Sequence, residues 1–138
     1  MYLIDTNVVS ELRKRNKANQ GVRAFFRQAI ATNADVYLSV ATIGELRRGV
    51  ELIRRRGDTA QAGQLDAWLG EILRNFAQNI LPVDTDVSQV WGRLRVPHPE
   101  HELDKLIAAT ALVHDLTVVT RNVNDFSKTR VPLLNPFS

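Results

Sequence analysis

Residues 2–12 read YLIDTNVVSEL, which places a short apolar run, a polar turn and an amphipathic segment in direct succession. The apolar run Tyr2–Ile4 has the composition of a buried strand. The residues that follow, Asp5–Asn7, are types that cap helices, so they predict a helix through Leu12. The first unit is therefore expected to be a strand, an acidic turn and a helix.

Strand-like and helix-like segments continue to alternate along the chain. Strands are predicted at 36–39, 80–83, 116–120 and 131–134, and helices at 42–53, 62–76, 86–94 and 103–113. The strand at 80–83 is expected at a sheet edge, because Pro82 cannot donate a hydrogen bond to a neighbouring strand. This order predicts an α/β fold in which helices cover both faces of a central parallel β-sheet. With 138 residues and no repeat or linker, we expect a single domain over residues 1–138.

Composition narrows the class of protein. The absence of cysteine excludes disulfides and thiolate-bound zinc, and it fits a reducing cytoplasm. No apolar run approaches the roughly 20 residues of a membrane-spanning helix, and the first residues lack the features of a secretory signal. We therefore expect a cytoplasmic protein without membrane contact. The net charge of +3 and the pI near 9.7 are mild evidence for an anionic partner.

Polar side chains follow two of the predicted strands and begin two of the predicted helices. Asp5 and Asn122 directly follow strands, whereas Glu45 and Asp104 lie in the first turns of helices. Taken singly, Asp5 is explained as a helix cap, Glu45 as a solvated helix residue and Asp104 as a partner of the helix dipole. Together they are expected at the carboxyl edge of the sheet, where ligands bind in such folds. Carboxylates that converge there need a cation, and oxygen ligands select Mg²⁺ or Mn²⁺, ions suited to phosphodiester hydrolysis.

Four ordered sequence blocks resemble the signature of the PIN-domain nucleases. They are residues 3–7, Glu45-Leu46 with Gly49, residues 104–111, and residues 120–122 with Asp125-Phe126. The chain is similar in particular to the VapC-type toxins of bacterial toxin–antitoxin pairs, from residue 2 to the tail at 135–137. The resemblance implies a PIN-like three-layer α/β/α sandwich and a Mg²⁺-dependent endoribonuclease, with Mn²⁺ as a substitute. It further implies structured RNA such as tRNA or rRNA as substrate, a VapB-like antitoxin, and a homodimer or higher toxin–antitoxin assembly.

The resemblance also assigns roles to individual residues. By position, Asp5, Glu45 and Asp104 are the acidic metal-site residues, Asp5 and Asp104 being the main ligands and Glu45 the residue that orients or deprotonates the attacking water. The fourth position departs from the common pattern, because Asn122 stands where many relatives have aspartate. Either Asn122 contributes as a neutral ligand or hydrogen-bond donor, or Asp125 supplies the charge. One carboxylate fewer also argues against a second metal ion.

Further polar residues near these blocks have supporting roles in this interpretation. Thr6, Asn7 and Thr120 are candidates to hold the carboxylates in place, although caps and turns use the same residue types. Contacts with RNA phosphates or with an anionic antitoxin tail are predicted for Arg13, Lys14, Arg15, Arg47 and Arg48. His98 and His101 are interpreted as part of a solvated loop rather than as metal ligands.

Three other functions are compatible with parts of the sequence. One is an RNA-processing PIN nuclease without an antitoxin. Another is a catalytically weak PIN module that binds RNA or acts as a scaffold, which Asn122 would favour. A phosphoacceptor receiver domain shares the sheet type, but it needs a lysine after the last strand that the sequence lacks.

Overall fold

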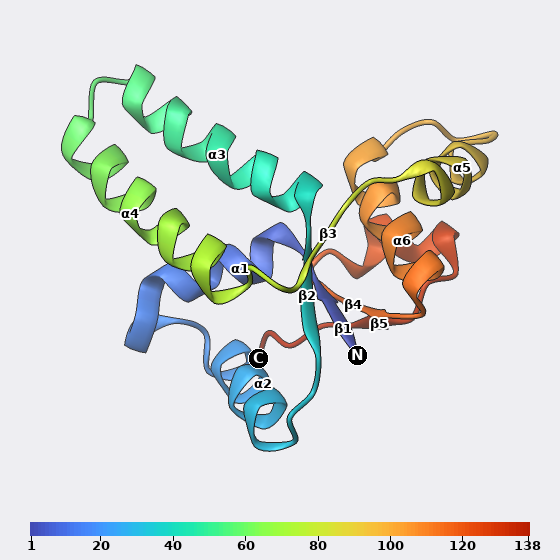
Figure 1. The fold of residues 1–138 in the computed structure, drawn as a ribbon, viewed down its shortest axis with the longest axis horizontal. Coiled ribbons are helices and arrows are strands. Elements are labelled where there is room, and N and C mark those ends of the chain that lie inside the picture. The colour runs from blue at the N-terminus through green and yellow to red at the C-terminus, as the bar shows by residue number, and fades with distance from the viewer.

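A five-stranded sheet forms the middle layer of the computed structural model, which describes residues 1–138 (Figure 1). The strand order is β3-β2-β1-β4-β5, and every neighbouring pair is parallel. The bounds are Tyr2–Ile4 for β1, Val36–Ser39 for β2, Ile80–Leu81 for β3, Thr117–Val119 for β4 and Leu133–Leu134 for β5. The predicted parallel sheet is confirmed, and β3 lies at an edge, as expected for a strand followed by Pro82.

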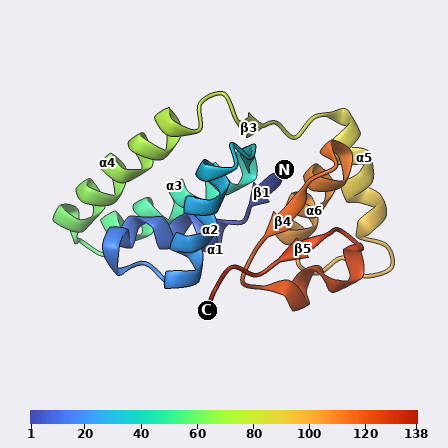
Figure 2. The same ribbon diagram turned by 90° about the horizontal axis from the view of Figure 1, so that it is seen from below.

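Helices cover both faces of this sheet, as Figure 2 shows from below. One face carries α1 to α4, and the other carries α5 and α6. The bounds are Thr6–Glu11 for α1, Gln20–Ala31 for α2, Val40–Arg55 for α3, Thr59–Asn75 for α4, Thr85–Leu94 for α5 and Glu102–His114 for α6. Two 3-10 helices complete the fold, η1 at Leu12–Lys17 and η2 at Val123–Thr129. The predicted three-layer α/β/α sandwich is confirmed, and none of its helices is long and apolar enough to cross a membrane.

The central strand β1 divides its side chains between two apolar cores. Ile4 packs with Val8 of α1 and Leu46 of α3 in the core under α1 to α4. Leu3 points to the opposite face, where it packs with Ala108 of α6 and Phe126 of η2. This division follows from the two-residue period of a strand. Because both faces are covered, β1 is fixed in position, and so is the residue that follows it.

Helix α2 is not among the helices that were predicted from the sequence. It begins after Asn19, whose side-chain oxygen accepts hydrogen bonds from the backbone N–H groups of Gly21 at 2.9 Å and Val22 at 3.3 Å. Phe25 and Phe26 on its inner side pack against the core under α1 to α4. The capping asparagine and the apolar spacing are visible in the sequence, so the omission was avoidable.

The end of the chain lies against the start of α2 and leaves no room for a side chain at Gly21. A Cβ atom added there would lie 2.0 Å from the carbonyl oxygen of Pro136. We therefore expect Gly21→Ala to lower the free energy of unfolding by about 1–3 kcal/mol. Gly63→Ala in α4 is the matched control, because no atom lies within 4 Å of its added Cβ and a helical alanine stabilises by roughly 0.5–1 kcal/mol. Urea unfolding of both variants measures the difference, and equal effects at the two positions would contradict the close approach.

Candidate active site

Asp5 lies in the turn between β1 and α1 with both of its carboxylate oxygens hydrogen-bonded. Its Oδ1 accepts from the backbone N–H of Thr6 at 2.8 Å. Its Oδ2 accepts from the hydroxyl of Thr120 at 2.7 Å and from the side-chain amide of Asn7 at 3.2 Å. Only 4% of Asp5 is exposed, so these donors fix a nearly buried carboxylate. The predicted proximity of Thr6, Asn7 and Thr120 to Asp5 is therefore seen directly.

Thr120 joins the ends of β1 and β4. Besides donating to Asp5, its hydroxyl oxygen accepts from the backbone N–H of Asn122 at 3.0 Å. Asn7 bridges the same two segments, because its side-chain oxygen accepts from the backbone N–H of Arg121 at 3.0 Å. These bonds hold Asn122 at the same edge of the sheet as Asp5.

The four residues predicted from the strand ends and helix starts line one cavity of about 270 Å³, namely Asp5, Glu45, Asp104 and Asn122. Glu45 comes from the second turn of α3, a helix whose start is capped by the Ser39 hydroxyl accepting from the Ala41 N–H at 3.0 Å. Asp104 comes from the first turn of α6. Three separate elements therefore bring carboxylates to the same space beyond the ends of the central strands.

Asp125 lies beside this cavity rather than in its lining. The side chains of His101, Asp104 and Asp125 each place one possible ligand atom within 4.8 Å of the others. The sequence predicts that His101 lies in a solvated loop, and the side chain is exposed in the structure. Its closeness to the two carboxylates was missed, because it depends on the backbone conformation of the turn before α6.

The protonation equilibria of the two aspartates reflect this crowding. Burial raises the pKa of Asp5 despite the hydrogen bonds from Thr120, Thr6 and Asn7, which oppose the effect. Burial, followed by repulsion from Asp5 and Asp125, raises the pKa of Asp104 to about 6. Carboxylates that hinder one another's ionisation in this way are stabilised by a shared cation.

The donor set is suited to a hard divalent ion. It consists of carboxylate and amide oxygens with no thiolate, which is the ligand chemistry of Mg²⁺ and Mn²⁺. Within Asp5, Oδ2 already accepts two hydrogen bonds, whereas Oδ1 accepts one. Since a carboxylate oxygen has about two lone-pair sites, Oδ1 is the atom of Asp5 that is available to an ion.

The predicted basic contact residues differ in how far their charge is already neutralised. Lys14 pairs with Glu11 at 2.9 Å and Arg15 with Glu71 at 3.4 Å. Arg13 and Arg48 form no ion pair, and Arg13 shares a groove of about 340 Å³ with Thr6 and Glu45. Of the five, Arg13 is thus the cation placed close to the cavity with its charge uncompensated.

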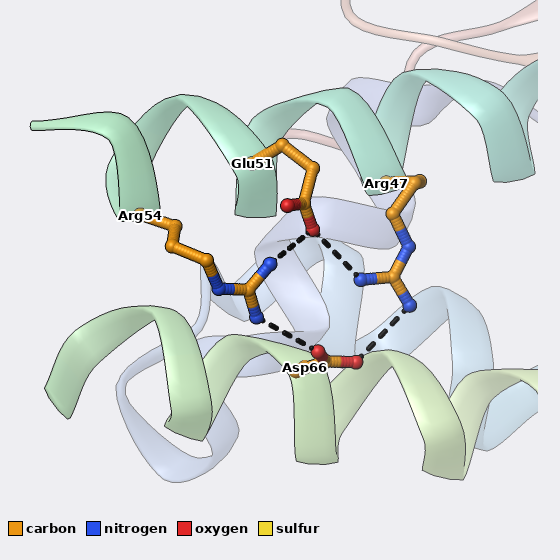
Figure 3. Close-up of polar contacts among 4 residues, drawn as sticks. All are labelled: Arg47, Glu51, Arg54 and Asp66. Atoms are coloured by element: carbon orange, nitrogen blue, oxygen red, sulfur yellow. Dashed lines mark hydrogen bonds and ion pairs between the residues drawn. The ribbon is translucent and has the colours of Figure 1, made fainter. Parts of the chain in front are cut away.

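Arg47 belongs to a closed group of four charged residues that joins α3 to α4 (Figure 3). Its guanidinium contacts Glu51 at 3.2 Å and Asp66 at 3.0 Å, and Arg54 contacts the same two carboxylates. Two positive and two negative charges cancel within the group. This arrangement favours a structural role for Arg47, namely bracing the pair of helices that carries Glu45.

The raised pKa of Asp104 predicts a pH dependence for the metal-free protein. Asp104 has an ordinary pKa of 3.8 and a folded-state pKa of about 6. The unfolded chain therefore releases this proton first, and the stabilisation present below pH 3.8 is lost as the pH rises to about 6. Urea unfolding with EDTA across this range should show a flatter pH dependence for Asp104→Asn than for the unsubstituted protein. Parallel profiles would show that Asp104 titrates normally.

Comparison with known proteins agrees with this geometry. The PIN domain family matches residues 2–132. Toxin FitB of Neisseria gonorrhoeae is 38% identical over 99% of both chains, and VapC ribonuclease Y4jK of Sinorhizobium fredii is 32% identical over 99% of this chain and 98% of its own. The crystal structure of FitAcB from Neisseria gonorrhoeae aligns with a TM-score of 0.78 and 37% identity, covering 99% of this chain and 98% of the other. The chain thus belongs to the PIN-domain family, in the group of FitB- and VapC-type toxins.

Proposed function

We propose that this protein is a Mg²⁺-dependent endoribonuclease and the toxin of a toxin–antitoxin pair, acting as a single cytoplasmic PIN domain. The observation that carries the proposal is the convergence of Asp5, Glu45 and Asp104 on one cavity. It is supported by relatives that are named toxin FitB and VapC ribonuclease Y4jK. Structured RNA such as tRNA or rRNA is the proposed substrate.

In this proposal each cavity residue has a defined task. Asp5 and Asp104 hold the ion, and Asn122 or Asp125 completes the site. A divalent ion held by these residues would supply polarisation of the scissile phosphate and a lowered pKa for a coordinated water. Glu45, which lines the same cavity, accepts the proton of the attacking water or orients it. Thr120 and Asn7 keep the carboxylate of Asp5 in one orientation, so that no reorganisation is needed during the reaction.

The proposed partners follow from charge and from family membership. Arg13 and Arg48 are the candidates for RNA phosphate contacts, which makes binding dependent on salt concentration. A VapB-like antitoxin is the proposed inhibitor, and a homodimer or a larger toxin–antitoxin assembly is the proposed form in the cell. Asn122, the departure at the fourth position, favours the alternative of a catalytically weak RNA-binding PIN module.

Cleavage of RNA by the purified protein tests the proposal. A tRNA and rRNA pool is incubated with the protein in Mg²⁺, in Mn²⁺ and in EDTA, before and after addition of any small protein that is encoded beside it. We expect cleavage only with a divalent ion and its suppression by an antitoxin. A protein that binds no divalent ion and cuts no RNA after removal of every partner would rule out the nuclease. Cleavage without any neighbouring antitoxin would favour an RNA-processing enzyme instead.

Asn122→Asp tests the fourth position. The added carboxylate would neutralise more of the ion's charge, so cleavage is expected to be retained or increased, with Mg²⁺ affinity rising by about tenfold. Isothermal titration with Mg²⁺ and cleavage rates at saturating Mg²⁺ separate the two effects. Complete loss of cleavage would instead show that the amide of Asn122 has a specific role.

A further inference from the structure

His101 occupies an unusual position at the start of α6. It precedes the first helical residue with a left-handed backbone, φ 56° and ψ 46°. Its side chain makes no capping hydrogen bond to the helix, and its carbonyl oxygen accepts from the Lys105 N–H at 2.9 Å. The start of α6 is therefore bonded to the backbone of His101, and the imidazole is not used as a helix cap.

The loop before His101 is held in place from inside the protein. Lys105 is only 3% exposed, and its ammonium group donates a hydrogen bond to the carbonyl oxygen of His98. A buried lysine that bonds a loop carbonyl fixes the path of the chain between these residues. The position of His101 is thus set by the structure on both sides of it.

The imidazole faces two carboxylates. Its Nε2 lies 3.9 Å from Oδ1 of Asp125, and the nearest ligand atoms of His101, Asp104 and Asp125 all lie within 4.8 Å of one another. An ion bound at about 2.0–2.2 Å separates its ligands by roughly 3–4 Å. The side chains of His101 and Asp125 are 50% and 38% exposed, so neighbouring groups leave them room to rotate toward a common ion.

Asp104 links this group to the main cavity. Its carboxylate lines the cavity with Asp5 and Glu45, and it also belongs to the group with His101 and Asp125. On the cavity side the fourth position is the neutral Asn122. A further ligand from the His101 side would therefore complete a donor set that has one carboxylate fewer than the common pattern.

We infer that His101, with Asp104 and Asp125, directly coordinates a divalent ion at this site, and that the imidazole gives Mn²⁺ an advantage over Mg²⁺. The inference rests on the proposed metal-dependent function and adds a nitrogen ligand to it. Imidazole suits transition metals, whereas Mg²⁺ is held mainly by oxygen ligands. The alternative is that His101 and Asp125 form only an exposed ion pair.

Electron spin echo envelope modulation spectroscopy of the Mn²⁺-loaded protein tests the inference, because it detects the ¹⁴N nucleus of a directly coordinated imidazole. The chain has only three histidines, so the signal can be assigned by substitution. His101→Asn is the test variant, since asparagine readily adopts a left-handed backbone. His98→Asn is the matched control on the same loop, and circular dichroism confirms that both variants fold.

We expect ¹⁴N coupling in the unsubstituted protein and in His98→Asn, and none in His101→Asn. The dissociation constant for Mn²⁺ should rise by about tenfold in His101→Asn, with a smaller change for Mg²⁺. Bound Mn²⁺ without ¹⁴N coupling, or coupling that persists in His101→Asn, would overturn the inference and leave the nuclease proposal intact. Absence of Mn²⁺ binding together with absence of RNA cleavage would overturn both.

Discussion

Asp5→Asn is expected to lower the rate of RNA cleavage by on the order of 10³-fold while changing the stability of the metal-free protein little, because relief of a buried charge offsets the loss of a hydrogen bond that an amide nitrogen cannot accept. The substitution keeps the shape of the side chain and removes the charge from the cavity. Because burial raises the pKa of Asp5, its ionised form is disfavoured in the folded protein without a cation. The substitution is therefore expected to reduce activity far more than stability, which is the pattern of a functional site.

Cleavage assays in Mg²⁺ and urea unfolding in EDTA measure these two effects separately. Asp115→Asn is the matched control, because Asp115 is an exposed residue at the opposite end of α6 with a left-handed backbone that asparagine also adopts. It should cleave at the original rate. An Asp5→Asn protein that is folded and fully active would refute the assignment of Asp5 as a metal ligand.

Glu45→Gln is expected to reduce cleavage by about 10²–10⁴-fold, the usual contribution of a general base. Affinity for the divalent ion should fall far less than in Asp104→Asn, because Glu45 acts on the water rather than as a main ligand in the proposed mechanism. Isothermal titration with Mg²⁺ and single-turnover cleavage distinguish the two variants. If Glu45→Gln and Asp104→Asn lose ion affinity equally, Glu45 would be a direct metal ligand like Asp104.

A second glutamate on the same helix provides the control for Glu45. Glu51 lies two turns further along α3, where it pairs with Arg47 and Arg54 (Figure 3). Glu51→Gln weakens an exposed ion-pair group and should leave cleavage unchanged. A loss of cleavage in Glu51→Gln would instead show that the contact between α3 and α4 controls the placement of Glu45.

The parallel sheet and its strands were predictable because the strands are short, apolar and bounded by polar turns, whereas the order of the strands was not predicted. The strand at Tyr2–Ile4 was placed correctly, and the edge position of β3 followed from Pro82. Strand boundaries were less accurate. The strand predicted at 131–134 is confined to Leu133–Leu134, since apolar composition alone does not show where pairing begins.

The candidate site was predictable to the extent that it depends on the rule for parallel sheets. Asp5 and Asn122 follow neighbouring strands, so their meeting at one edge could be inferred. The position of His101 could not be inferred, because it depends on the left-handed backbone of His101 and on the bond from buried Lys105 to the preceding loop. Nor could the pairing of Arg47 with Asp66, which depends on how α3 and α4 pack.

The hydrogen bond between Asp5 and Thr120 joins residues that are 115 positions apart. At synthesis rates of about 5–20 residues per second, a ribosome needs roughly 6–23 s to pass from the first partner to the second. During that interval β1 has no β4 to pair with, and Asp5 has no hydroxyl from Thr120 to orient it. A chain that ends before residue 120 therefore lacks both β4 and the hydroxyl that orients Asp5, so the proposed catalytic centre cannot assemble in it.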